Sequence, residues 1–210
     1  MISEKYKCIF IEVPKTGSTS IRAVLGHPKK PHLDIVQTRQ ELECILQLSY
    51  LYDRPDDVWD PDKPKRMADS IFQEFFKFGF VRNPWDRTVS LYERKEGIQL
   101  SGKMTFEEFV EWINYSSDTC IHPTRHKNQL DWFVDHEGNV LVDFIGRFEK
   151  LQDDWKQICE KLAIDATLPH ANPNLSHRKH YTEYYSAKTK EMITSKFRLD
   201  IEYFGYEFGQ

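Results

Sequence analysis

The stretch CIFIEVPKTGSTSIRAVL, residues 8–25, decides the fold of this chain. Its first four residues are apolar and predict a buried strand, and the turn residues between Pro14 and Gly17 predict a sharp change of direction. The remainder predicts a helix, because apolar residues recur at helical spacing and a glycine stands where helices commonly end, at Ile21, Val24, Leu25 and Gly26. A strand, a turn and a helix therefore follow one another directly.

This turn and helix start predict an anion-binding site. The first amides of a helix have no intrahelical partner and that end of the helix dipole is positive, which suits a phosphate-like or sulfate-like group. Lys15 adds a cation, and hydroxyl groups come from Thr16, Ser18, Thr19 and Ser20. In the usual nucleotide triphosphate loop the lysine follows the last glycine, whereas here Lys15 precedes Gly17 in a shorter loop that suits one terminal group. The alternative is an ordinary strand-turn-helix with a surface lysine.

Length and composition predict a folded protein with a sizeable core. The chain has 210 residues, of which 40% are hydrophobic and 14% aromatic, and its formal net charge is −4. This length suggests one domain. A general nucleic-acid binder would be strongly basic, so the net charge argues against that class of protein.

Cysteine spacing and hydropathy predict the environment of the protein. The cysteines are scattered without CxxC spacing, which favours buried free thiols over disulfides or a zinc site; they are Cys8, Cys44, Cys120 and Cys159. No apolar run approaches the ~18 residues of a membrane helix, and no signal peptide is visible. We therefore expect a cytoplasmic protein that binds neither membrane nor nucleic acid.

The rest of the chain alternates predicted strands with predicted helices. We expect strands at residues 8–11, 77–82 and 140–145. Helices are expected to open at Thr105 and to cover residues 38–51, 67–76, 85–96, 124–134, 148–162 and 187–204. This alternation predicts an α/β, P-loop-like fold of three layers, in which a mostly parallel central sheet is flanked by helices.

A second anion-binding segment is FVRNPWDRTVSLY, residues 80–92. Arg82 ends a predicted strand, Asn83 is a good helix cap, and Pro84 suits the first helical position. Ser90 follows two turns later, on the side of the helix where Arg82 lies, and an arginine with a serine suits a phosphate monoester. The alternative is that Arg82 pairs with Asp86 while Ser90 faces solvent.

These two segments carry a resemblance. PKTGST after an N-terminal strand, followed by VRNPWDRTVSLY, resembles the sulfotransferase superfamily, whose members use 3′-phosphoadenosine 5′-phosphosulfate (PAPS). The later segments VDFIGRFEKLQDDWKQIC and KFRLDIEYFGYEF are similar to the branch that contains carbohydrate sulfotransferases and short bacterial relatives. The resemblance covers nearly the whole chain. It implies a single sulfotransferase domain over residues 1–210, with PAPS as donor, adenosine 3′,5′-bisphosphate (PAP) as product and no required metal.

The resemblance also implies roles for individual residues. Lys15 would contact the 5′-phosphosulfate and its bridging oxygen, while Arg82 and Ser90 would hold the 3′-phosphate. Other cofactor contacts would come from the amides and hydroxyls of Thr16, Gly17, Ser18, Thr19 and Ser20. The Golgi members of this branch carry a transmembrane anchor that this sequence does not display. That departure argues against a Golgi glycan as the substrate. We expect a carbohydrate or small-metabolite acceptor, which the sequence does not identify.

Sulfuryl transfer also needs a group that takes a proton from the acceptor. Catalysis otherwise depends on positioning and electrostatics, and Lys15 is the natural partner for charge on the leaving oxygen. We predict His32 as the base, with His27 and Glu12 as alternatives, because histidine titrates near neutral pH. A structural role is the alternative for any of these histidines.

Two other functions and one other segment remain open on sequence alone. The chain could be a nucleotide-dependent small-molecule kinase, although no magnesium carboxylate is recognisable, or a nucleotide-binding module without catalysis. Residues 175–181, LSHRKHY, are basic and would either cover the cofactor or attract an anionic acceptor. The alternative for this segment is a solvated loop.

Overall fold

The computed structural model describes residues 1–26, 32–52, 60–93, 104–115, 127–169 and 178–210. Its centre is a four-stranded sheet in the order β1-β2-β3-β4. The strands are β1 (Ile2–Ser3), β2 (Cys8–Ile11), β3 (Phe76–Val81) and β4 (Phe144–Arg147). β1 is antiparallel to β2, whereas β2, β3 and β4 are parallel to one another, so the predicted mostly parallel sheet is confirmed.

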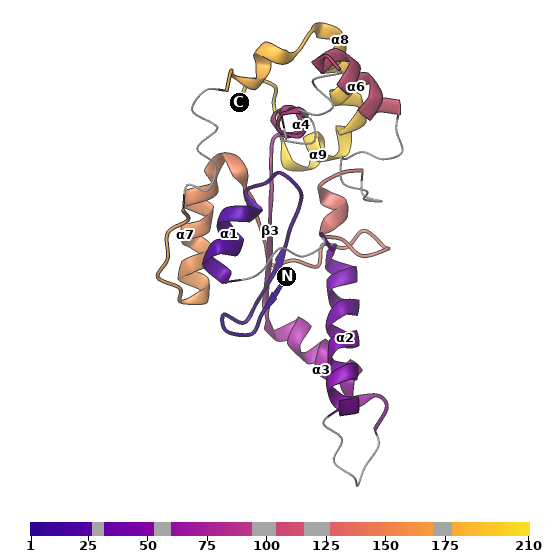
Figure 1. Cartoon of the computed structure of the whole chain (residues 1–210), viewed down its shortest axis with the longest axis vertical. Coiled ribbons are helices and arrows are strands. Elements are labelled where there is room, and N and C mark those ends of the chain that lie inside the picture. Colours follow the sequence, from indigo (N-terminus) through magenta and orange to yellow (C-terminus); the bar gives the residue numbers. More distant parts are fainter. Residues whose placement is uncertain (27–31, 53–59, 94–103, 116–126, 170–177) are drawn as a thin grey trace.

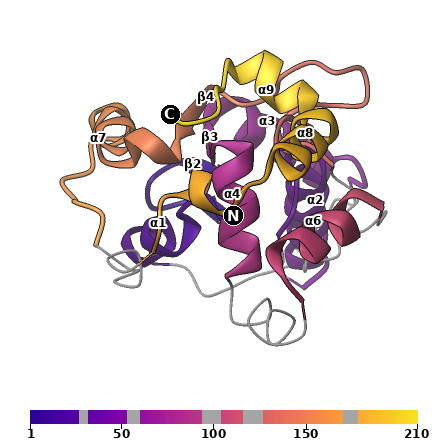
Figure 2. The same cartoon turned by 90° about the horizontal axis from the view of Figure 1, so that it is seen from above.

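Helices cover both faces of this sheet. α1 (Ser18–Leu25) and α7 (Leu151–Leu162) lie on one side, and α2 (Ile35–Tyr52) lies on the other (Figures 1 and 2). The other helices are α3 (Lys63–Glu74), α4 (Pro84–Tyr92), α6 (Phe106–Tyr115), α8 (Ala187–Lys196) and α9 (Arg198–Phe204). Three short 3₁₀ turns complete the described elements: η1 (Leu130–Trp132), η2 (Phe148–Lys150) and η4 (Tyr181–Tyr184).

The alternating directions of the β2 side chains explain why helices pack on both faces of the sheet. Successive side chains of a strand point to opposite faces, and all four residues of β2 are fully buried. Cys8 and Phe10 pack with α1 and α7, whereas Ile9 and Ile11 pack with the larger apolar cluster that includes residues of α4, α6, α8 and α9. A sheet buried on both faces is typical of parallel strands in α/β proteins, and the predicted three-layer arrangement is observed.

Three predicted elements differ from the structure. Within the described part of residues 124–134 there is only the turn η1, because the carboxylate of Asp200 accepts the backbone N–H groups of Gln129 and Leu130 at 2.8 and 3.0 Å. A continuing α-helix would direct those groups to its own carbonyls. The strand predicted at residues 140–145 begins only at Phe144, and Val140 makes an isolated bridge to Val134.

The predicted C-terminal helix, residues 187–204, is two helices. It breaks at Phe197, whose φ of −107° and ψ of 29° are not helical, and whose ring is 2% exposed. Burial of this ring determines the bend, which apolar periodicity alone does not reveal. The start of α6 is as predicted, since Thr105 Oγ1 accepts the Glu108 N–H at 3.3 Å while the Glu108 carboxylate accepts the Thr105 N–H at 2.6 Å.

The cysteines are free thiols in different surroundings where the structure describes them. Cys8 and Cys159 are buried free thiols, as predicted, and Cys44 is free and exposed, whereas Cys120 lies outside the described residues. Burial raises the pKa of Cys8 to about 12, so this thiol is chemically inert near neutral pH. Among the described helices, none is long and apolar enough to cross a membrane.

Candidate functional site

The loop between β2 and α1 has the backbone of an anion-binding turn. The φ angles of Lys15 and Gly17 are +73° and +88°, both in the left-handed region. A Cβ on Gly17 would lie 3.0 Å from Leu151 and 3.3 Å from Phe148, so glycine alone fits this passage. Gly17 is also the N-cap of α1, and no side chain caps that helix end. The helix start is therefore open to an anion in the way that the sequence predicts.

The predicted hydroxyl ligands in this loop have different surroundings. Thr16 is buried and its hydroxyl donates to the Val13 carbonyl at 2.8 Å, so only its backbone amide can serve a ligand. Ser18 is buried, Ser20 is half-buried and Thr19 is exposed. The Thr16 side chain thus stabilises the loop, and the hydroxyls that can reach a ligand are those of the helix start.

The second predicted anion site begins where β3 ends. Asn83 accepts the N–H groups of Trp85 and Asp86 at 3.1 and 3.3 Å, and Pro84 is the first helical residue, so the predicted start of α4 is confirmed. The preceding residue, Arg82, is fixed through its backbone. Its N–H donates to the Gln129 side-chain oxygen at 2.9 Å, and its carbonyl accepts from the Gln129 amide nitrogen at 2.8 Å.

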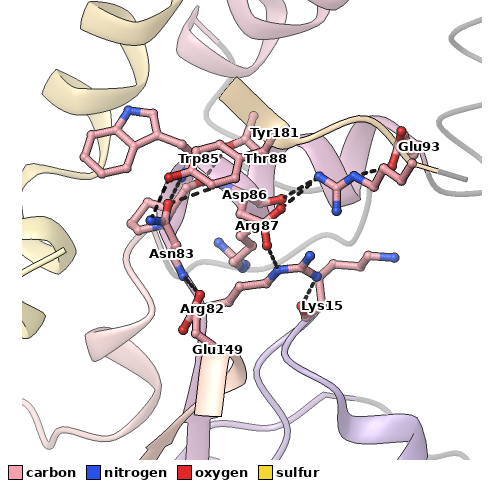
Figure 3. Close-up of polar contacts among 12 residues, drawn as sticks. Lys15, Arg82, Asn83, Trp85, Asp86, Arg87, Thr88, Glu93, Glu149 and Tyr181 are labelled. Atoms are coloured by element: carbon pink, nitrogen blue, oxygen red, sulfur yellow. Dashed lines mark hydrogen bonds and ion pairs between the residues drawn. The ribbon is translucent and has the colours of Figure 1, made fainter. Parts of the chain in front are cut away.

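The guanidinium of Arg82 lies between the two predicted anion sites. Its Nε donates to Asp86 Oδ2 at 2.6 Å, and its Nη1 donates to the Lys15 carbonyl at 3.2 Å (Figure 3). It also stacks 4.0 Å above the centre of the Phe148 ring. Burial lowers the pKa of Arg82, and the charge of Asp86 opposes that effect. The Arg82–Asp86 pair is therefore present, and it holds the guanidinium beside the Lys15 loop.

Ser90 does not contact Arg82 in the described structure. Ser90 is half-buried and follows Asp86 by four residues on α4, so both lie on one face of the helix. Arg82 reaches only as far as Asp86 along that face. The structure thus brings Arg82 and Lys15 together and leaves Ser90 one helical turn farther away.

A pocket of about 280 Å³ opens beside the Arg82 guanidinium. It is lined by side chains of opposite charge and by aromatic rings: Arg82, Asp86, Phe148, Arg178, Lys179, His180, Tyr181 and Gln210. The side chain of Arg178 is only 9% exposed and contacts Asp86 Oδ1 at 2.9 Å and Glu93 Oε2 at 2.8 Å. The Asp86 carboxylate therefore lies between two guanidinium groups.

The structure thus gives the surroundings of part of the basic segment, residues 175–181. Arg178 is buried in the pocket wall rather than solvated, while Lys179 and His180 are exposed at its edge. Residues 175–177 of the predicted segment lie outside the described residues. The cationic side chains of Arg82, Arg178 and Lys179 outnumber the two carboxylates that pair with the arginines, Asp86 and Glu93, so the pocket favours an anion.

Two of the three candidate bases lie together near the end of β2. The His32 Nδ1 is 2.8 Å from the Glu12 carbonyl. Because a carbonyl only accepts hydrogen bonds, Nδ1 carries the hydrogen and Nε2 is the atom that can take a proton. His32 also meets the Trp132 ring edge-on, with centroids 6.3 Å apart. His27, the other candidate, lies outside the described residues.

Glu12 is a buried carboxyl group with weak pairing. It is 4% exposed, its Oε2 accepts no hydrogen bond, and the Arg22 Nε is 3.5 Å away. Burial raises the pKa of Glu12, and the charge of Arg22 opposes this only in part. Within the described residues, no group of three or more His, Cys, Asp or Glu side chains could hold a metal ion.

Comparison with known proteins identifies the family. The sequence matches the model of the sulfotransferase family over residues 1–207. The chain belongs to this family. The chain is 19% identical to carbohydrate sulfotransferase 11 of Mus musculus and 21% identical to carbohydrate sulfotransferase 10 of Homo sapiens, each over 98% of this chain and 66% of the relative. The resemblance inferred from the two motifs is therefore confirmed.

Other comparisons place limits on this similarity. An uncharacterised protein of Archaeoglobus fulgidus is 30% identical over 49% of this chain and 80% of its own length. The chain spans between 45% and 66% of the length of the carbohydrate sulfotransferases that it matches. No solved structure matches it.

Sequence reasoning missed three residues of this candidate site. Asp86 and Phe148 hold the Arg82 guanidinium, and Arg178 faces it across the pocket. Asp86 has a usable signal, since it follows Arg82 by four residues, but on sequence alone such a pair competes with a binding role. Arg178 belongs to the basic segment at residues 175–181, whereas nothing in the local sequence marks Phe148.

Proposed function

We propose that this sulfotransferase transfers the sulfuryl group of PAPS to a hydroxyl or amine of its acceptor. The observation that carries the proposal is the contact between the two anion sites, where Arg82 Nη1 donates to the Lys15 carbonyl at 3.2 Å. A donor with a 5′-phosphosulfate and a 3′-phosphate carries two anionic groups a ribose apart. Neighbouring anion sites on a loop and on the end of a parallel strand suit such a molecule.

The residues present fit this donor. The open start of α1 and the left-handed backbone at Gly17 offer amides to the 5′-phosphosulfate. In this proposal the contacts to that group come from Lys15, Thr16, Gly17, Ser18, Thr19 and Ser20. In this proposal the 3′-phosphate is held by Arg82 and, from one helical turn farther along α4, by Ser90, while Arg178 lines the pocket beside Arg82. A guanidinium offers paired hydrogen bonds to a phosphate, so the pocket would select donors that carry the 3′-phosphate.

Each step of the transfer then has a residue of this chain. The donor supplies a sulfuryl group whose bond to the bridging oxygen breaks as a bond to the acceptor oxygen or nitrogen forms, which releases PAP. Lys15 stabilises the charge that grows on the bridging oxygen. His32 takes the acceptor proton at Nε2, since its Nδ1 hydrogen is held by the Glu12 carbonyl. His27 and Glu12 stay as alternative bases.

The acceptor is proposed from the relatives. Those named above are carbohydrate sulfotransferases, and we propose a carbohydrate or a small metabolite with a free hydroxyl or amine. Acceptor-binding loops vary most within such folds, so the acceptor has to be found by experiment.

The proposal is tested by comparing nucleotides and then acceptors. Calorimetric titration with PAP, 5′-AMP and ATP with Mg²⁺ should give the tightest binding for PAP. Transfer of ³⁵S from labelled PAPS should then be followed on a panel of saccharides, phenols and amines, with ATP and Mg²⁺ as the donor control. Tighter binding of ATP than PAP, or phosphate transfer without sulfuryl transfer, would contradict the proposal. Tight PAP binding without transfer to any acceptor would indicate a binding module.

A further inference from the structure

The anion loop is held by the second motif through its backbone carbonyls. Arg87 of α4 donates from Nε to the Pro14 carbonyl at 3.0 Å, and Arg82 donates from Nη1 to the Lys15 carbonyl at 3.2 Å. We call these two contacts the carbonyl clamp. Both arginines are 4% exposed, and the two carbonyls belong to consecutive residues. Figure 3 shows Arg82 and Arg87 on the α4 side of the loop that carries Lys15.

The carbonyl clamp determines where the loop amides point. No cis peptide bond occurs in the described chain, and the C=O and N–H of a trans peptide point in opposite directions. When Arg87 holds the Pro14 carbonyl, the Lys15 N–H of the same peptide unit is turned to the far side of the loop. The Arg82 contact turns the Thr16 N–H in the same way. The clamp therefore orients the amides on which anion binding by such a turn depends.

The loop needs such support because its backbone is strained. Lys15 has a φ of +73°, which side chains with a Cβ rarely adopt and which persists only where the surroundings enforce it. A buried arginine donating to each neighbouring carbonyl supplies that enforcement. Arg87 reaches the loop across 73 residues of sequence, so its contact is a property of the fold and not of the local chain.

We propose that Arg87 is a positioning residue for the 5′-phosphosulfate loop, which acts through the Pro14 carbonyl. This rests on the proposed function, because it assumes that the loop binds the 5′ group of the nucleotide. Arg87 belongs by sequence to the motif of the 3′-phosphate, yet its contacts assign it to recognition at the 5′ end. That reversal makes the proposal testable with two mononucleotides.

The experiment measures the affinity of 5′-AMP and 3′-AMP by calorimetry for folded wild-type and variant proteins. Arg87→Met keeps the length of the side chain and removes the donor. It should lower the affinity for 5′-AMP about 10-fold, the loss expected when one supporting hydrogen bond disappears. The affinity for 3′-AMP should change by less than about 2-fold. Arg87→Lys, which can still donate to the Pro14 carbonyl, should recover most of the 5′-AMP affinity.

Arg147→Met is the matched control. Arg147 also donates to a backbone carbonyl, that of Phe204, and stacks on Tyr206, so its side chain contacts neither carbonyl of the clamp. Its loss should lower the melting temperature without selective loss of 5′-AMP. Equal weakening of 5′-AMP and 3′-AMP by Arg87→Met would indicate general damage and overturn the proposal, as would unchanged 5′-AMP affinity.

The outcomes also separate this inference from the proposed function. If wild-type protein binds PAP no more tightly than 5′-AMP, the 3′-phosphate site and the proposed function fail. The effect of Arg87→Met on 5′-AMP affinity still tests the positioning role of Arg87 in that case. If PAP is preferred and Arg87→Met leaves 5′-AMP binding intact, only the role of Arg87 fails. Absence of binding by all three nucleotides overturns both.

Discussion

Arg82 combines two neighbours of different character, a carboxylate and a backbone carbonyl. The Asp86 carboxylate fixes Nε, which leaves the two Nη groups directed at the Lys15 loop and the pocket. A guanidinium held at one edge loses little freedom on binding a phosphate with the other. Asp86 is thus compatible with a binding role for Arg82, although the sequence alone presents the ion pair as its competitor.

Loss of Arg82 should therefore weaken the binding of nucleotides that carry a 3′-phosphate more than the binding of nucleotides that lack one. Arg82→Ala is expected to weaken PAP by roughly 2–5 kcal/mol, as when one partner of a charge-assisted pair is removed. Binding of 5′-AMP should weaken only about 10-fold, the loss expected for one contact of the carbonyl clamp, because 5′-AMP has no 3′-phosphate for Arg82 to hold. Calorimetry with both nucleotides measures the difference, and Arg198→Ala, an exposed arginine of α9, is the control. Equal losses for PAP and 5′-AMP would remove Arg82 from the 3′-phosphate site.

Lys15 should affect turnover more than folding. Lys15→Ala is expected to lower kcat by about 10²–10³-fold, by analogy with the loss of one donor to a developing oxyanion. Steady-state rates at saturating PAPS with a working acceptor measure this, and the exposed Lys156→Ala on α7 is the matched control. A folded Lys15→Ala protein with near-normal kcat would refute the role in stabilising leaving-group charge.

His32 should determine the acidic side of the pH–rate profile. A histidine base is inactive once protonated, so activity should fall on the acidic side of the profile. His32→Ala should cut kcat by about 10²–10⁴-fold, flatten that limb and leave PAP affinity nearly unchanged. His136→Ala, in an exposed turn, is the control. Full activity of His32→Ala together with loss in Glu12→Gln or His27→Ala would reassign the base.

At the scale of elements, a long ion pair connects the end of β2 to helix α1. It is formed by the buried Glu12 and by Arg22, whose Nε is 3.5 Å from Glu12 Oε2. Burial raises the pKa of Glu12, so the folded protein binds a proton there more tightly than the unfolded chain does. From the ordinary glutamate pKa near 4.3 up to the raised value, this group therefore makes stability fall as pH rises. Glu12→Gln removes that contribution.

The measurement is urea unfolding of wild type and Glu12→Gln between pH 4 and pH 8. The unfolding free energy of wild type minus that of the variant should decline with rising pH across this window and then level off. A difference that grows with pH would mean that the Arg22 pair outweighs the burial of the carboxyl, and that Glu12 is ionised in the folded protein.

The elements also indicate what sequence can and cannot predict. Local signals sufficed for the turn at Gly17 and for the Asn83–Pro84 start of α4, because caps and turns depend on neighbours in sequence. They failed at residues 124–134, where the Gln129 backbone N–H donates to Asp200, which lies 71 residues away in the sequence. Arg178 likewise contacts Asp86 across 92 residues. The periodicity of apolar residues carries no information about such long-range polar contacts.

At the scale of the whole molecule, the pocket is assembled from distant parts of the chain. One wall follows β3, another is Phe148 after β4, and the third is the segment around Tyr181. The C-terminal residues close on the same place, since the Tyr181 hydroxyl accepts the Gly209 N–H at 2.5 Å and donates to the Gln210 carbonyl at 3.2 Å. A ligand here would therefore contact three segments that lie far apart in the sequence.

Ligand binding should accordingly stabilise the entire fold. At 100 times its Kd, PAP should add ~2.7 kcal/mol to the unfolding free energy, which for a chain of this size corresponds to a rise in Tm of about 5–11 °C. The same concentration of 5′-AMP should give a smaller shift, because it lacks the group that Arg82 and Arg178 would hold. Differential scanning calorimetry with PAP, 5′-AMP and ATP with Mg²⁺ provides the measurement, and Arg82→Ala should reduce the PAP shift to that of 5′-AMP. Equal shifts for PAP and 5′-AMP in wild type would mean that the pocket beside Arg82 does not read the 3′-phosphate.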